Sequence, residues 1–281
     1  MLLKNSRRIC EMRTKFLAIP YVVWMAIFVV APIILVVIYA FTTADGGFTL
    51  GNFSSMMSYL SVFGRSFYLA LISTVICILI GYPIAYILSK QGAGFQRIVI
   101  MLFMLPMWMN FLLRTYSWMS ILENTGLLNK FLSLIGLPTV NIINTQGAVV
   151  LGMVYNFLPF MILPIYSVIV KIDNSLIEAA QDLGGNSIAV FRRVLFPLSL
   201  PGILSGVTMV FVPAVSTFVI SQLLGGGKQM LLGDLIEMQF LGSAYNPHLG
   251  SAIALVMMII VTIFMYIINK FGDGEEQAVM L

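Results

Sequence analysis

Six long runs of apolar residues, separated by shorter polar stretches, dominate the pattern along the chain. They cover residues 16–41, 66–88, 98–122, 146–170, 202–224 and 249–269. A bilayer core about 30 Å thick requires about 20 predominantly apolar residues per helix, and each run reaches that length. The pattern therefore predicts an all-α integral membrane protein with six transmembrane helices. No linker divides residues 1–281, so we expect a single transmembrane domain.

The first run follows several basic residues, which is also the arrangement of a cleaved secretion signal. It extends from Phe16 to Phe41, well beyond the roughly 7 to 15 apolar residues of a signal core. We therefore expect a retained first span.

Lysine and arginine are divided unevenly between the two sides that six spans define. With the N-terminus inside, four lie on the outer side: Arg65, Arg114, Lys130 and Lys228. Eleven lie on the cytoplasmic side: Lys4, Arg7, Arg8, Arg13, Lys15, Lys90, Arg97, Lys171, Arg192, Arg193 and Lys270. The positive-inside rule then predicts that both termini and segment 171–201 are cytoplasmic. Arg114 lies toward one end of its run, where its side chain could snorkel to the interface.

Composition agrees with a membrane protein, because 60% of the residues are hydrophobic and only 9% are charged, against roughly 25% charged in soluble domains. The net charge of +4 follows from the cytoplasmic basic residues, so we expect no nucleic-acid partner. Cys10 and Cys77 do not suggest a disulfide, and no metal site is expected because His248 is the only histidine.

The three outer polar segments, 42–65, 123–145 and 225–248, are long for simple helix connections. They contain short apolar pieces, Phe53 to Phe63 and Leu127 to Leu137 among them. Two alternatives stay open, namely short interfacial or re-entrant helices and ordinary surface loops.

The cytoplasmic segment 171–201 has the pattern of two helices joined by a turn. Asn174 or Ser175 can cap the first helix, and Asn186 or Ser187 can start the second. Gly184 supplies a turn that tolerates positive φ. Proline has a fixed φ that suits a helix start, so Pro197 and Pro201 are expected at the start of the fifth span.

The spacing of this segment reads E-A-A-x3-G-x6-F-x2-V-x2-P-x3-P, with every position filled. It resembles the cytoplasmic signature of the membrane subunits of ABC importers. The resemblance implies a type I importer permease fold, with a coupling helix between spans four and five that docks on a separate ATPase. Glu178 and Asp182, four residues apart on one helical face, could pair with a partner. The residues assigned to this coupling segment are Glu178, Ala179, Ala180, Asp182, Gly184, Phe191, Val194, Pro197 and Pro201.

The chain itself carries no complete phosphate-binding loop. Gly227-Lys228 resembles the end of one, but Gln222 stands at the first glycine and Gln229 replaces the Ser or Thr. We therefore expect no enzymatic activity and no cofactor on this chain, with ATP and Mg²⁺ bound by partner subunits.

Stretches outside the coupling segment resemble the spermidine/putrescine class of permeases. They include Arg114-Thr115-Tyr116, Asn124-Thr125-Gly126, Leu158 to Met161, Gly225-Gly226 and Gln239-Phe240-Leu241. The resemblance implies a bacterial inner-membrane importer with a related second permease, two ATP-binding subunits and an extracytoplasmic polyamine-binding protein. Other cargo stays open (an oxyanion, an amino acid or a thiamine-like cation), as does an ion-coupled secondary transporter.

A polyamine pathway requires hydrogen-bond acceptors, some carboxylates and aromatic faces for cation–π contact. Candidates are Trp108, Asn110, Tyr155, Asn156, Ser216, Thr217, Phe218, Gln222, Asp234 and Glu237. Each has a structural alternative. Trp108 could belong to an interfacial aromatic belt, and Asn156 could satisfy the backbone of a kinked helix. Ser216 could serve helix packing. Asp234 and Glu237 could be solvated charges in a loop. Gly202-x-x-x-Gly206 is expected to serve helix packing.

Overall fold

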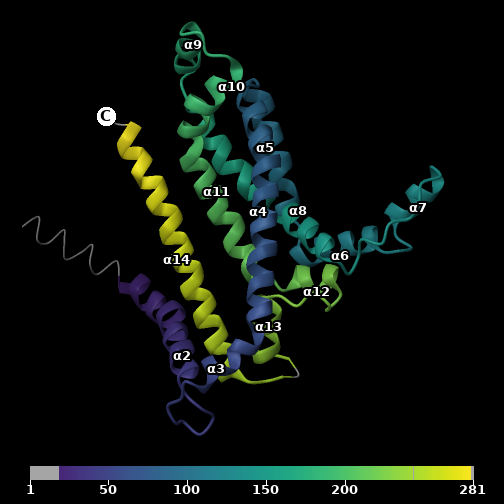
Figure 1. Cartoon of the computed structure of the whole chain (residues 1–281), viewed down its shortest axis with the longest axis vertical. Helices are drawn as coiled ribbons and strands as arrows, with labels where there is room; N and C mark the ends of the chain where they lie inside the picture. The colour runs from purple at the N-terminus through teal and green to yellow at the C-terminus, as the bar shows by residue number, and fades with distance from the viewer. Residues whose placement is uncertain (1–18, 243, 280–281) are drawn as a thin grey trace, which may run out of the picture. The chain divides into compact units, whose positions relative to one another are not determined.

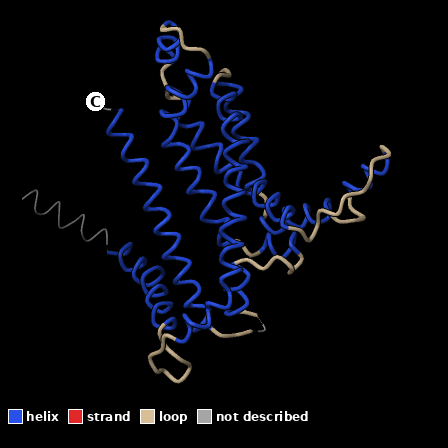
Figure 2. Tube along the Cα trace, in the orientation of Figure 1, coloured by secondary structure: helices blue, strands red, loops and turns tan. Residues whose placement is uncertain are grey.

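A computed structural model describes residues 19–242 and 244–279 (Figures 1 and 2). The regular elements in this part of the chain are helices, and the only bridge of β type is an isolated one between Thr42 and Phe48. By their residue contacts they form two compact units. Unit 1 comprises residues 1–58 and 238–258, and unit 2 comprises residues 59–237 and 259–281.

Unit 1 is built around the first span, which is helical over Ile19–Ala40 and includes a π-helical turn at Ala26–Val30. Its last part, α2 (Ala31–Ala40), is followed by α3 (Gly51–Met56) and a 3₁₀ turn (Met57–Tyr59). Ala40 packs with Ala252 and Leu255 from the beginning of α14 (Pro247–Val279). Phe41 and Phe53 cover this small core.

Unit 2 has a core of three long helices that lie side by side: α4 (Leu60–Ser89), α8 (Gln146–Ile169) and α11 (Phe196–Ser216) (Figure 1). Glycines allow their close approach. A Cβ on Gly81 of α4 or Gly206 of α11 would lie 3.1 Å or 2.7 Å from side-chain atoms of Met161, on α8. Gly202 meets the backbone of Pro164 in the same way, so the predicted packing role of Gly202 and Gly206 is confirmed.

The third predicted span, 98–122, is wrong as a single helix. It is broken into α5 (Ala93–Trp108) and α6 (Phe111–Leu122), and the helical path bends by 92°. Met109 and Asn110 are extended, with ψ of 149° and 129°. Asn110 then starts the new helix, because its Oδ1 accepts from the backbone N–H groups of Leu112 and Leu113.

The fifth predicted span, 202–224, is also interrupted. α11 ends at Ser216, Thr217 is extended with ψ of 141°, and α12 (Val219–Gly225) begins after Phe218. At its other end the helical path starts earlier than predicted, running over Ser187–Ser216.

Five helices among the described residues are long and apolar enough to cross a membrane, and the bent pair formed by α5 and Phe111–Leu134 makes a sixth candidate. The fourth prediction, 146–170, agrees with α8 to within one residue. The second span begins earlier, at Leu60, and the sixth continues to Val279. Residues 16–18 of the first lie outside the described residues.

The polar segments contain short helices rather than irregular loops alone. They are α3, α7 (Leu127–Leu134) and α13 (Leu232–Phe240). The helical alternative is therefore correct for part of each of these segments.

Candidate functional site

The coupling segment begins with α9 (Asn174–Asp182), and the capping residue is Asp173 rather than the predicted Asn174 or Ser175. Oδ1 of Asp173 accepts from the backbone N–H of Ser175 at 3.0 Å. This hydrogen bond lowers the pKa of the Asp173 carboxyl, because it favours the charged form. Aspartate is among the residues preferred at a helix start, together with asparagine and serine, because its side-chain oxygen accepts from a free backbone N–H.

Two glycines end α9 and turn the chain into α10 (Ser187–Val190). Gly184 has φ of +82°, a conformation that costs side-chain-bearing residues about 1 kcal/mol or more. A Cβ on Gly185 would lie 2.5 Å from the carbonyl oxygen of Ala180. Asn186 then caps α10 through its Oδ1, which accepts from Ala189 N–H at 2.8 Å, as predicted.

A π-helical turn at Phe191–Leu195 joins α10 to α11, so the helical path continues through this region. Pro197 lies in the first turn of α11, as predicted, whereas Pro201 lies inside the helix, so the predicted helix start is wrong for Pro201. Proline cannot donate to the preceding turn and crowds the carbonyl four residues before it. A wide turn directly before Pro197 relieves that crowding, which accounts for the location of the π-helix.

Aromatic contacts attach the coupling segment to α4. The ring of Phe191 packs edge-on against Tyr82, with 5.5 Å between ring centroids, and Phe196 lies against both rings. The hydroxyl of Tyr82 is 3.0 Å from that of Ser199 in α11. Nearby, Nζ of Lys90 donates to Oδ1 of Asn174 at 2.9 Å. A displacement of the segment would therefore act on α4 and α11 together.

The other side of the coupling segment is open and partly apolar. Leu183 is 90% exposed and Ile188 is 70% exposed. Among the predicted coupling residues, the exposed ones are Glu178, Ala179, Asp182, Gly184 and Phe191, and the half-buried ones are Ala180, Val194, Pro197 and Pro201. Large apolar side chains exposed beside acidic residues are typical of an interaction surface.

Around the break of the third span, Arg114 is a buried residue that the sequence analysis did not assign to the site. Its side chain is 9% exposed, and Nε donates to Oδ1 of Asn156 at 2.8 Å. The guanidinium also donates to the carbonyl oxygen of Pro106. The expected snorkelling is wrong, because these two acceptors hold the cation inside unit 2. A charged residue within an apolar run was the available signal.

The neighbouring pathway candidates separate into different roles. The Arg114 guanidinium lies 5.9 Å from the ring centroid of Tyr155, whose ring meets Trp118 edge-on. Nδ2 of Asn156 donates to the carbonyl oxygen of Gly152, so both ends of this amide have a partner within the protein. Trp108 is 76% exposed, and Asn110 is the helix cap described above.

Around the break of the fifth span, the structure brings six predicted residues to one region of unit 2, where α12 and α13 follow the end of α11. They are Ser216, Thr217, Phe218, Gln222, Asp234 and Glu237. Nε2 of Gln222 donates to Oε2 of Glu237 at 3.2 Å. Phe218 and Gln222 are exposed, Glu237 is half-buried, and Thr217 is buried.

Asp234 is buried, with 8% of its surface exposed, so the alternative of a solvated loop charge is wrong for this residue. Its Oδ2 accepts from the backbone N–H of Leu231 at 2.8 Å, while Oδ1 is buried without a hydrogen-bond partner. Burial raises the pKa of the Asp234 carboxyl to about 6, and the negative charge of Glu237 adds to this rise, against smaller lowering effects of Ser221, the Leu231 N–H and Gln222.

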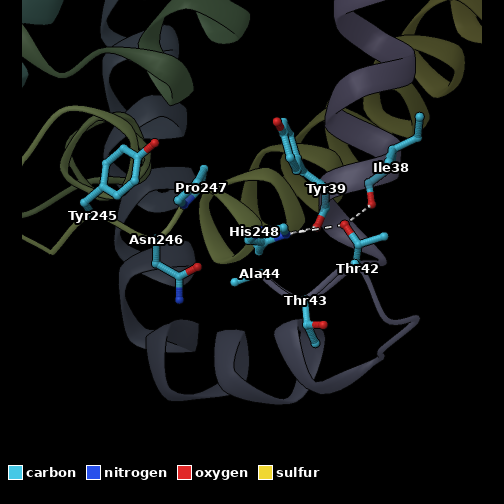
Figure 3. Close-up of a pocket in the computed structure, with 10 residues that line it drawn as sticks. Ile38, Tyr39, Thr42, Thr43, Ala44, Tyr245, Asn246, Pro247 and His248 are labelled. Carbon is cyan, nitrogen blue, oxygen red and sulfur yellow. Dashed lines mark hydrogen bonds between the residues drawn. The ribbon is translucent and has the colours of Figure 1, made fainter.

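Unit 1 holds a separate cavity of about 830 Å³ that the sequence analysis did not predict (Figure 3). Nδ1 of His248 lies 3.2 Å from the carbonyl oxygen of Tyr39 and 3.4 Å from the hydroxyl of Thr42. No group of three or more potential metal ligands occurs among the described residues. The lining of the cavity is mainly apolar, with Ile38 and Pro247 among its residues, and hydroxyl, amide and imidazole groups are interspersed with them.

Comparison with solved structures identifies the fold. A bacterial ABC transporter involved in the import of the acidic polysaccharide alginate shares the fold, with a TM-score of 0.79 and 17% identity over 97% of this chain and 98% of that chain. The inward-facing MetNI methionine ABC transporter is more distant, with a TM-score of 0.56 and 19% identity over 79% of this chain and 98% of that one. The fold is that of type I ABC importer permeases.

Residues 77–273 match the family described as binding-protein-dependent transport system inner membrane component, and the chain belongs to this family. It is 39% identical to the spermidine/putrescine transport system permease protein PotB of Haemophilus influenzae, over 87% of this chain and 88% of that protein. The PotB protein of Escherichia coli is 35% identical over 87% of this chain and 92% of its own length.

Proposed function

We propose that the chain is the membrane-spanning permease subunit of an ATP-driven importer that translocates polyamines. The main support for the class of ABC importer permeases is the coupling segment. It is a short helix followed by a glycine turn, with exposed apolar side chains on one side and aromatic contacts with α4 on the other. The similarity to PotB proteins over 87% of the chain supports spermidine and putrescine as the cargo.

The partners of the proposed importer follow from the class. Two ATP-binding subunits, which carry ATP and Mg²⁺, would receive the coupling segment, and a second homologous permease would complete the channel as a heterodimer. An extracytoplasmic binding protein would deliver the polyamine. The charge distribution supports an orientation in the bacterial inner membrane with both termini in the cytoplasm. The whole chain then forms one transmembrane domain that supplies no ATPase chemistry.

Coupling would proceed through the contacts of Tyr82. When the ATPase subunits close, they displace α9, and the ring of Phe191 transmits this displacement to Tyr82 on α4. The hydroxyl contact with Ser199 joins α11 to the same movement. Because α4 and α11 both pack on α8, their movement changes the arrangement at the far ends of these helices, where the acidic residues lie.

The alternative cargoes are less well supported. Arg114 would suit an oxyanion, but its guanidinium already donates to two protein acceptors, Asn156 and Pro106. An amino acid or a thiamine-like cation would be expected to meet the same polar residues. An ion-coupled secondary transporter has no use for an external ATPase, and family membership argues against it.

Co-purification of the tagged chain followed by an ATPase assay over a solute panel tests the proposal. We expect ATPase subunits in the complex, with ATP hydrolysis stimulated by spermidine or putrescine together with the binding protein. A complex without an ATPase would overturn the class, and stimulation by another solute alone would overturn the cargo.

A further inference from the structure

The interruption of the fifth span leaves the carboxyl end of a long helix in contact with the start of α13. Gly233 lies directly against this helix end, since a Cβ there would be 2.5 Å from the carbonyl oxygens of both Ser216 and Thr217. The final carbonyls of a helix carry a partial negative charge. In secondary transporters with broken helices, a different class of protein, such ends coordinate Na⁺ or H⁺.

Asp234 follows Gly233 and adds a full negative charge at the same position. Two N–H groups at the start of α13 have partners: Leu231 donates to Oδ2 of Asp234, and Leu232 donates to the hydroxyl of Ser66 at 2.8 Å. The hydroxyl of Ser221 is near the carboxylate but donates its proton to the carbonyl oxygen of Phe218 at 2.8 Å. Oδ1 of Asp234 is therefore a buried acceptor without a donor.

Glu237 and Gln222 lie near Asp234 and are more exposed than it. Glu237 lies one helical turn after Asp234, and the amide of Gln222 fixes its carboxylate at 3.2 Å. Gln222 is exposed, Glu237 is half-buried and Asp234 is buried, so burial increases from Gln222 through Glu237 to Asp234. Among the described residues, no lysine or arginine is recorded in an ion pair with either carboxylate.

We propose that Asp234, the carbonyl end of α11 and Glu237 form a subsite for a primary ammonium group. An –NH₃⁺ group brings one positive charge and three N–H donors, which match an unpaired carboxylate oxygen and neighbouring carbonyl oxygens. Glu237 at the rim would meet the cation first, and Asp234 would hold it when the site is closed. The inference rests on the proposed function and identifies the chemistry of its cargo site.

Uptake of radiolabelled putrescine and spermidine by the complete importer tests the subsite. Asp234→Asn keeps the shape and an acceptor for Leu231 but removes the charge, so we expect KM to rise about tenfold or more. Asp45→Asn, an exposed aspartate in unit 1, is the matched control and should transport like the wild type. Wild-type kinetics of Asp234→Asn would overturn the subsite while leaving the proposed function intact. If the wild-type complex transported neither polyamine, the proposed function itself would fail.

Gln222→Lys provides a second test that does not require Asp234 to be altered. The new ammonium lies beside both carboxylates, so we expect it to occupy the subsite, abolish uptake and raise the midpoint of thermal unfolding. Gln222→Met is the uncharged control: it loses the contact with Glu237 as well, so its uptake should fall, but without an ammonium it should not raise the midpoint of thermal unfolding. Normal uptake by Gln222→Lys would overturn the proposal even if Asp234→Asn failed to reach the membrane.

Discussion

Nε of Arg114 donates a 2.8 Å hydrogen bond to Oδ1 of Asn156, and the same guanidinium donates to the carbonyl oxygen of Pro106. These contacts connect α6 and α8 with the last turn of α5, across the 92° bend. A cation near the carboxyl end of a helix is electrostatically favourable, so Arg114 both neutralises that end and fixes the bend.

Replacing Arg114 by methionine should destabilise the protein. The substitution leaves the oxygens of Asn156 and Pro106 without their donor in a buried location, at a cost of about 1–3 kcal/mol. We expect a lower midpoint of thermal unfolding in detergent. Arg97→Met removes an exposed arginine from α5 and is the control. Equal midpoints for the two variants would contradict the role of Arg114.

Replacing Gly184 by arginine should abolish uptake while the protein still inserts into the membrane. The substitution combines backbone strain at φ of +82° with a bulky charge on the proposed docking surface. Gly136 has φ of +78° and open space around it, so Gly136→Arg controls for strain alone. Uptake assays measure transport by each variant, and blots of the membrane fraction measure its insertion. Similar uptake by Gly184→Arg and Gly136→Arg would count against docking at Gly184.

Removing the Tyr82 ring should uncouple ATP hydrolysis from transport. Tyr82→Ala removes the contacts with Phe191 and Phe196, whereas Tyr82→Phe loses only the hydroxyl contact with Ser199. We expect a large loss of uptake per ATP hydrolysed in the alanine variant. The phenylalanine variant should lose about 1 kcal/mol of stability and stay largely coupled. An unchanged transport-to-ATPase ratio in Tyr82→Ala would exclude this route.

The stability of the wild type should fall as the pH rises from about 4 to above 6. The pKa of Asp234 is raised from 3.8 to about 6 in the folded protein, so the folded state binds more protons than the unfolded state in this window. The stabilisation from protonated Asp234 is complete below 3.8, the pKa of the unfolded state, and is lost as the pH rises through about 6, the pKa of the folded state. This difference of about two pKa units corresponds to roughly 3 kcal/mol in the free energy of unfolding. Asp234→Asn should remove this component in thermal unfolding measured between pH 4 and 7.5. The same pH dependence in that variant would assign it to another group.

The apolar pattern predicted the continuous helices but not the two breaks. α8 was predicted almost to the residue, because its apolar run and its helix coincide. At Met109–Asn110 and at Thr217 the chain stays apolar or uncharged while the backbone becomes extended, and hydropathy does not measure φ and ψ. Asn110, a good capping residue shortly after Pro106, was the local signal for the first break.

The burial of Asp234 also depended on distant parts of the chain. Leu231 and Leu235 lie on the same helical side and are fully buried, which was a local indication. The decisive contact, between Leu232 and Ser66, joins residues 166 positions apart. The pairing of Arg114 with Asn156 is likewise long-range, so neither could be derived from spacing within a single element.

Met161 lies between two glycine surfaces, Gly81 of α4 on one side and Gly206 of α11 on the other. Glycine offers no side chain to interlock, and a thioether chain changes its rotamer at little cost. We expect that α4 and α11 can shift along α8 by small steps at this layer of contacts, without repacking of the core. A β-branched residue at position 161 would block this movement while leaving the resting structure folded.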